Sequence, residues 1–114
     1  MNQAKLNTQL YQKMYAEEKL YRAGLLLMPP REILNHAYEY VCRENILLSL
    51  EYNDLSSKQA LSLLNSSTPL ADVYQKLKNM GGCTSMDRAW DAVEARANEV
   101  VRADFIAQHR DDAR

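Results

Sequence analysis

The residues best suited to chemistry are two carboxylates, an imidazole and a guanidinium in a single row. In chain order they are Glu32, His36, Glu39 and Arg43. They follow one another at steps of four, three and four residues, so a helix would carry them on one face. Such a row could ligate a metal ion, form ion pairs along the helix, or contact a partner protein.

A metal site is the least favoured of these interpretations. A helical di-metal centre takes glutamates from several helices and a Glu-x-x-His motif from each of two. The row holds one histidine and the chain has no pair of such motifs, so we expect no metal and no cofactor. A solvated ion-pair row, at about 0.2–0.5 kcal/mol per pair, is the first interpretation. The second is a partner-binding surface of these four residues, extended by Tyr40.

The familiar catalytic motifs are absent. The chain has no Gly-x-Ser-x-Gly, no phosphate-binding glycine loop and no His-Glu-x-x-His. A Cys–His nucleophile pair would need Cys42 or Cys83 to meet His36 or His109, and nothing in the spacing places them together. The sequence therefore favours a protein that is not an enzyme.

Glu17 interrupts a stripe of apolar residues in the first helical segment. A buried carboxylate without a partner is costly. We therefore expect Glu17 to be exposed or to pair with Arg43 or another basic residue. A functional buried acid is the alternative.

The chain has seven tyrosines. Packed rings with hydrated hydroxyl groups account for most of them. Tyrosine is also enriched at protein interfaces, and Tyr11 and Tyr15 lie one helical turn apart. A contact surface around Tyr11, Tyr15 and Tyr40 is therefore a second candidate site.

Five helices and no strand are predicted to position these side chains. Apolar residues recur at steps of three and four, and glycine and proline lie at or near the segment boundaries. The segments cover about residues 3–27, 31–52, 57–65, 69–80 and 85–109. Ser56 and Gln59 predict a capping box, and Thr84 an N-cap. The fold class is all-α, a single compact bundle of five helices forming one domain over residues 1–114.

The second helical segment has apolar residues on two sides. One face carries Leu34, Ala37, Tyr38, Val41, Leu48 and Tyr52. Ile46, Leu47 and Leu50 lie on the other side, so we expect its second half to be enclosed and to contact at least the first and last helices.

Residues 57–77 also have the lengths of a helix-turn-helix. The turn lacks glycine, and the second helix offers lysines but no arginine. Two helices packed within the bundle are favoured over a DNA-binding regulator.

Charge alternates in sign along the chain although the net charge is only −1. Residues 1–31 carry five basic and two acidic residues, and residues 32–55 carry one basic and five acidic residues. Alternation lets neighbouring helices attract at their rims; an acidic face kept for a basic partner is the alternative. Binding to nucleic acid is not favoured.

The chain shows no secretion signal and no apolar run that could span a bilayer. Its two cysteines have no Cys-x-x-Cys spacing. We expect a cytoplasmic protein with two free thiols and no membrane contact.

Four stretches resemble a small uncharacterised domain family. They are residues 30–40, 43–47, 49–55 and 69–74, and the resemblance extends over about residues 8–100. The family is identified with conjugative elements and prophages of gut Gram-positive bacteria. It supplies no established activity and no catalytic residue.

The resemblance implies a context rather than a reaction. Small acidic-faced helical proteins of mobile elements often bind a host or element protein, and inhibitors of bacterial defence nucleases (anti-CRISPR-like proteins) are one such class. We therefore expect a non-enzymatic protein acting through protein contacts. A defence nuclease inhibitor, a DNA-binding regulator and a self-associating protein are the alternatives.

Overall fold

The first helix, α1 (Gln3–Leu26), is capped at both ends. The Asn2 side chain accepts a hydrogen bond from the N–H of Ala4 at 2.8 Å. At the other end the N–H of Leu27 donates to the carbonyl of Gly24 at 3.2 Å. The computed structural model describes residues 2–82 and 85–112, with side chains up to His109.

The single helix predicted over residues 31–52 is two helices, so the described chain has six helices and not five. They are α2 (Pro30–Asn35) and α3 (Ala37–Tyr52). The break lies at His36, where φ is −103° and ψ is 2°. Asn35 and His36 are both weak helix formers, and the break lets α2 fold against the end of α1.

Three further helices follow: α4 (Ser57–Leu64), α5 (Pro69–Asn79) and α6 (Met86–Asp112). The predicted capping box is present, since Ser56 and Gln59 exchange hydrogen bonds at 3.2 and 3.0 Å. Pro69 begins α5 as predicted. The last helix continues to Asp112, beyond its predicted end at residue 109. Cys83 and the N-cap predicted at Thr84 lie outside the described residues.

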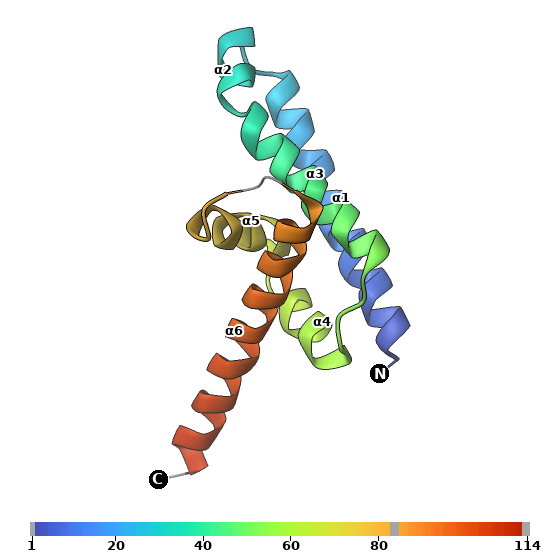
Figure 1. Ribbon diagram of the computed structural model, residues 1–114, viewed down its shortest axis with the longest axis vertical. Coiled ribbons are helices and arrows are strands. Elements are labelled where there is room, and N and C mark those ends of the chain that lie inside the picture. The colour runs from blue at the N-terminus through green and yellow to red at the C-terminus, as the bar shows by residue number, and fades with distance from the viewer. Residues whose placement is uncertain (1, 83–84, 113–114) are drawn as a thin grey trace.

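The helices form two layers (Figure 1). α1 and α3 make a long antiparallel pair with α2 at its far end, and α4, α5 and α6 pack against one side of that pair. Side chains from both layers build the core, among them Leu10, Met14, Ile46, Leu63, Leu70, Leu77 and Val93. The molecule measures 55 × 29 × 24 Å, because the α2 end and the C-terminal half of α6 both project (Figure 1).

The second half of the predicted helix over residues 31–52 is not enclosed as expected, and one apolar face of α2 and α3 is exposed along its length. Leu34 and Tyr52 retain 74% and 71% of their accessible surface, and Val41 retains 54%. α3 instead buries the side that holds Cys42 and Ile46. The expected contacts of this segment with the first and last helices are present, but those helices reach only one of its two apolar sides.

The turn after α5 depends on a glycine at position 82. Replacing Gly82 by alanine is expected to lower the free energy of unfolding by about 1–2 kcal/mol. Its φ of +97° lies in the left-handed region, and an added Cβ would lie 2.4 Å from the Tyr38 hydroxyl oxygen. Urea unfolding monitored by circular dichroism would measure the change.

Gly24 provides the matched control. It lies within α1, and a Cβ added there would meet nothing within 4 Å. Gly24→Ala is therefore expected to raise the free energy of unfolding by about 0.5–1 kcal/mol. Shifts of the same sign in both variants would contradict this account of Gly82.

Candidate functional site

The predicted surface row of Glu32, His36, Glu39 and Arg43 is partly buried. Arg43 is buried, and it lies over the ring of Tyr21 with 4.1 Å between the guanidinium carbon and the ring centroid. Its Nε and Nη2 atoms donate to the Glu39 carboxylate at 2.9 and 2.8 Å. These two residues therefore form a hydrogen-bonded ion pair within the fold.

Glu17 joins this internal cluster and caps α5. Its two carboxylate oxygens accept hydrogen bonds from the N–H groups of Leu70 and Ala71, each at 2.8 Å. One of them lies 4.0 Å from Arg43. The expected pairing of Glu17 with Arg43 is present. Glu17 also satisfies the first turn of α5, where the Thr68 side chain makes no capping bond.

The other predicted site residues are dispersed by the break at His36. Glu32 is exposed on α2, whereas His36 is half-buried with its ring edge-on to Tyr21 at 6.5 Å. Tyr40 is half-buried among apolar side chains, and burial raises its pKa. The predicted surface therefore is not continuous and exposed, and a role in binding a partner stays a prediction for its five residues, Glu32, His36, Glu39, Tyr40 and Arg43.

A groove runs along α1 and α3. Three adjoining cavities of about 390, 280 and 240 Å³ form it, and each shares lining residues with the next. On α1 the lining recurs at steps of three or four: Ala4, Thr8, Tyr11, Tyr15, Glu18, Arg22 and Leu26. On the α3 side it follows Ala37, Tyr40, Glu44, Leu47, Glu51 and Asp54. We call this feature the α1/α3 groove.

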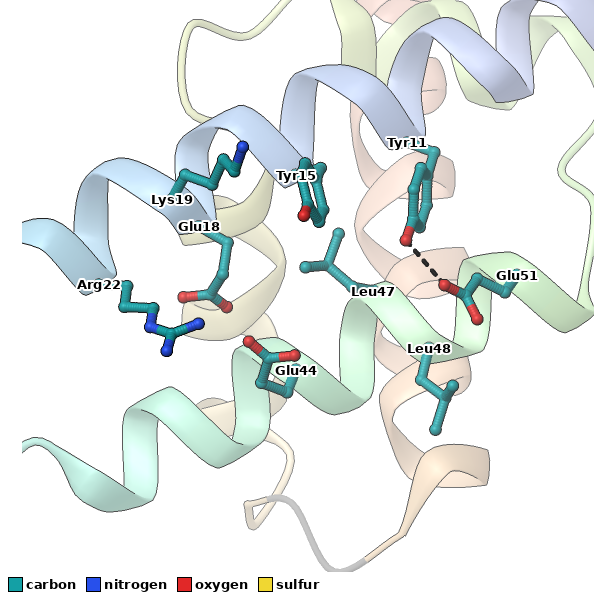
Figure 2. A pocket seen from close by; sticks show the side chains of 9 residues that line it. All are labelled: Tyr11, Tyr15, Glu18, Lys19, Arg22, Glu44, Leu47, Leu48 and Glu51. Carbon is teal, nitrogen blue, oxygen red and sulfur yellow. Dashed lines mark hydrogen bonds between the residues drawn. The ribbon is translucent and has the colours of Figure 1, made fainter.

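The middle of the groove contains a buried carboxylate. Glu18 is only 4% exposed, and neither of its carboxylate oxygens has a hydrogen-bond partner among the described residues. Figure 2 shows its carboxyl group pointing from α1 toward α3, where it faces Glu44. The Arg22 head group points toward both carboxyl groups (Figure 2), but it forms no ion pair with either in the described chain.

The electrostatics of the groove follow from these positions. Burial and, to a smaller extent, the charge of Glu44 raise the pKa of Glu18 to about 7 against the opposing charge of Arg43. Tyr11 donates a hydrogen bond to Glu51 at 2.7 Å, which raises the pKa of Tyr11 to about 12. Near neutral pH the groove therefore holds a carboxyl group poised to ionise beside two further carboxylates.

The α1 wall of the groove is aromatic and basic. The rings of Tyr11 and Tyr15 stack with their centroids 6.1 Å apart. The Nζ atom of Lys19 lies 5.2 Å from the Tyr15 ring centroid. This wall already holds a cation against an aromatic face, which is how a guest ammonium or guanidinium would also bind.

The end of the groove nearest α2 is apolar. Its cavity of about 240 Å³ lies among Leu25, Leu26, Ile33, Leu34 and Val41, with Tyr40 and Arg22 at its edge. The sequence-based alternative around Tyr11, Tyr15 and Tyr40 is thus brought together, since all three tyrosines line one groove.

Comparison with known proteins gives the chain a family. The model of a family described as a protein of unknown function, DUF3848, matches residues 6–101. The chain belongs to the DUF3848 family. No curated protein and no solved structure matches it.

The DUF3848 match agrees with the resemblance drawn from the sequence, which was expected to cover residues 8–100. The matched range includes all the residues that line the groove except Ala4. The proposed origin on a mobile element of gut bacteria stays a prediction.

Glu18 is the DUF3848 groove residue that sequence reasoning missed. Glu17 interrupts the apolar stripe three residues after Met14. Leu6, Leu10 and Met14 follow one another at steps of four, and the next step is Glu18. That regular spacing was the signal that placed a second carboxylate on the buried side of α1.

Other classes of site find little support in this DUF3848 chain. Over residues 2–82 and 85–112 no group of three or more His, Cys, Asp or Glu side chains is arranged to hold a metal. In the same residues no helix combines the length and apolar composition needed to cross a bilayer. Lys76, in the segment compared with a helix-turn-helix, pairs with Glu99 of α6 and lowers the pKa of that carboxyl. DNA binding stays a prediction.

Proposed function

We propose that this protein acts by binding a protein partner, and that a lysine or arginine side chain of the partner enters the α1/α3 groove beside Glu18. One observation carries the proposal: the carboxylate of Glu18 is buried and has no hydrogen-bond partner in the described chain. Buried carboxylates are normally paired or hydrogen-bonded. A donor supplied by a partner would satisfy this one.

The surroundings of Glu18 favour a cation as that donor. Glu44 and Glu51 lie on the facing wall, and the tyrosine rings of α1 offer aromatic faces. An ammonium or guanidinium group would gain charge-assisted hydrogen bonds and cation–π contact together. Among the rim residues, Lys19 and Arg22 are exposed on long side chains and could swing aside to admit it.

A narrower version of the proposal is an inhibitor of a defence nuclease. Surfaces that bind phosphate carry lysine and arginine, so an acidic groove would compete for them. What supports it is the chemistry of the groove and the expected mobile-element context. The broader proposal does not depend on it.

A peptide-display selection would test the proposed function. Immobilised protein is expected to enrich peptides that share a lysine or arginine, and Glu18→Gln is expected to weaken their binding at least about tenfold through loss of a charged hydrogen bond. Binding would be measured by fluorescence anisotropy at pH 8, where Glu18 is ionised.

Glu32→Gln serves as the matched control, because Glu32 is an exposed carboxylate outside the groove. It is expected to leave the affinity within about twofold of wild type. Enriched peptides without a basic residue, or a loss of binding with Glu32→Gln rather than with Glu18→Gln, would overturn the assignment to the groove.

A further inference from the structure

We infer that the partner presents an amphipathic α-helix, which lies along the α1/α3 groove with a basic residue beside Glu18 and a large apolar residue seven positions away in the pocket near α2. This inference rests on the proposed function and specifies the element that the groove accepts. The groove's repeat, its uncovered apolar face and the spacing of its two subsites support it independently.

The side-chain ridges on the two helical walls of the groove can interlock with those of a partner helix. The groove lining follows both walls at steps of three or four residues, as described above. A helix that lies over two antiparallel helices packs its side-chain ridges into the groove between them, and the three helices then form a bundle. No strand is present in the described chain to extend a partner strand, so a helix is the element that fits.

An uncovered apolar stripe along the groove would be buried by such a helix. Leu34 on α2 and Val41 and Leu48 on α3 are all exposed, although their spacing of seven residues along the sequence predicts one buried helix face. All three also line the groove. A third helix would cover them, which explains why their periodicity predicts burial while the chain alone leaves them in water.

The two subsites fix the spacing of the anchors. Glu18 and Leu25 lie seven residues apart on α1, two turns along the same side, so the acidic and apolar subsites are separated by roughly 10 Å at 1.5 Å per residue. A helix running along the groove repeats with the same rise. Its basic and apolar anchors are therefore seven positions apart.

The charged residues of the groove favour a helix from another protein over a second copy of this chain. The facing wall carries Glu44 and Glu51, which are also seven residues apart. A partner with basic residues flanking an apolar stripe complements both features. In a second copy, the exposed stripe Leu34, Val41 and Leu48 is bordered by Glu44 and Glu51. These would meet Lys19 and Arg22 on the α1 wall but their own counterparts on the α3 wall, so a second copy complements the groove less fully than a basic helix does.

Designed helical peptides test the inference. Alanine-rich peptides of about 20 residues would carry a lysine and a leucine seven positions apart, in both orders, or only one of the two. Fluorescence anisotropy at pH 8 is expected to show one two-anchor peptide binding at least about tenfold more tightly than either single-anchor peptide. Leu34→Ser is expected to reduce its affinity to that of the lysine-only peptide, and Glu18→Gln to that of the leucine-only peptide.

The failures of the two proposals are distinguishable. If the lysine-only peptide binds as tightly as the two-anchor peptides, the apolar subsite and the spacing are wrong while the basic subsite stands. If no peptide binds, or if binding ignores Glu18→Gln, the proposed function is wrong as well. A dimer found by sedimentation that Leu34→Ser dissociates would show that a second copy occupies the groove, and would overturn the inference.

Discussion

Replacing Arg43 by methionine is expected to lower the free energy of unfolding by about 3–5 kcal/mol, because the change breaks a buried charge cluster. The guanidinium is buried, bonds the Glu39 carboxylate, and lies over the rings of Tyr21 and Tyr74 at 4.1 and 5.9 Å. Methionine fills a similar volume but leaves the carboxylates of Glu39 and Glu17 without their cation. Urea unfolding at pH 7 would measure the loss.

Two further variants show whether the cost comes from the charge. Arg96→Met removes a half-buried arginine whose ion pair with Glu99, at 2.9 Å, lies at the surface, and it is expected to cost less than about 1 kcal/mol. Adding Glu39→Gln to Arg43→Met removes one of the abandoned carboxylates and is expected to recover part of the loss. If Arg43→Met costs no more than Arg96→Met, the cluster is not a structural element of the fold.

Local signals in the sequence predicted most of the helices. The Ser56–Gln59 capping box and the segment start at Pro69 each act on their own neighbours, and each appears where predicted. The break at His36 was missed because it depends on packing of α2 against the end of α1. Asn35 and His36 permit that break but do not require it.

The candidate site was less predictable, because periodicity does not say which of two apolar faces a neighbour will cover. Both sides of α3 have helical spacing, yet only the side with Ile46 is buried. The row containing Glu39 and Arg43 was recognised as a unit on one helix. Its partners Glu17 and Tyr21 come from another helix, and spacing within one segment cannot reveal them.

The neighbouring carboxylates of Glu17 and Glu18 differ in their contacts, and we assign the first to stability and the second to the proposed function. Glu17 accepts two backbone hydrogen bonds and lies beside Arg43. Glu18 is more buried and has no hydrogen-bond partner in the described chain. Stability alone explains why a carboxylate is present at Glu17. It does not explain Glu18, because an apolar side chain would fit that position at lower cost in free energy.

Replacing Glu18 by leucine is therefore expected to stabilise the protein by about 2 kcal/mol at pH 8 while abolishing binding of basic peptides. Leucine extends the stripe of Leu10 and Met14 and removes a carboxylate that burial destabilises. Urea unfolding and fluorescence anisotropy on the same sample would measure both effects. Glu17→Leu, at the adjacent position, is expected to destabilise by about 2–3 kcal/mol, because it removes the cap of α5.

The pH dependence gives a second readout for the same residue. Burial raises the pKa of Glu18 from about 4.5 to about 7 in the folded protein, so the folded state binds this proton more tightly than the unfolded state. Its contribution to stability is complete below pH 4.5 and is lost as the pH rises through 7. The charged groups near it on both helices are Glu17, Lys19, Arg22, Glu39, Arg43, Glu44 and Glu51.

The difference in unfolding free energy between wild type and Glu18→Gln is therefore expected to change by about 1–2 kcal/mol between pH 4.5 and 8, with wild type relatively weaker at the higher pH. A basic peptide bound in the groove should reverse that trend, because it stabilises the ionised carboxylate. A merely structural Glu18 would instead give a destabilised leucine variant and a pH dependence that no peptide alters. The sign of the Glu18→Leu effect thus decides whether this carboxylate is retained for the fold or for a partner.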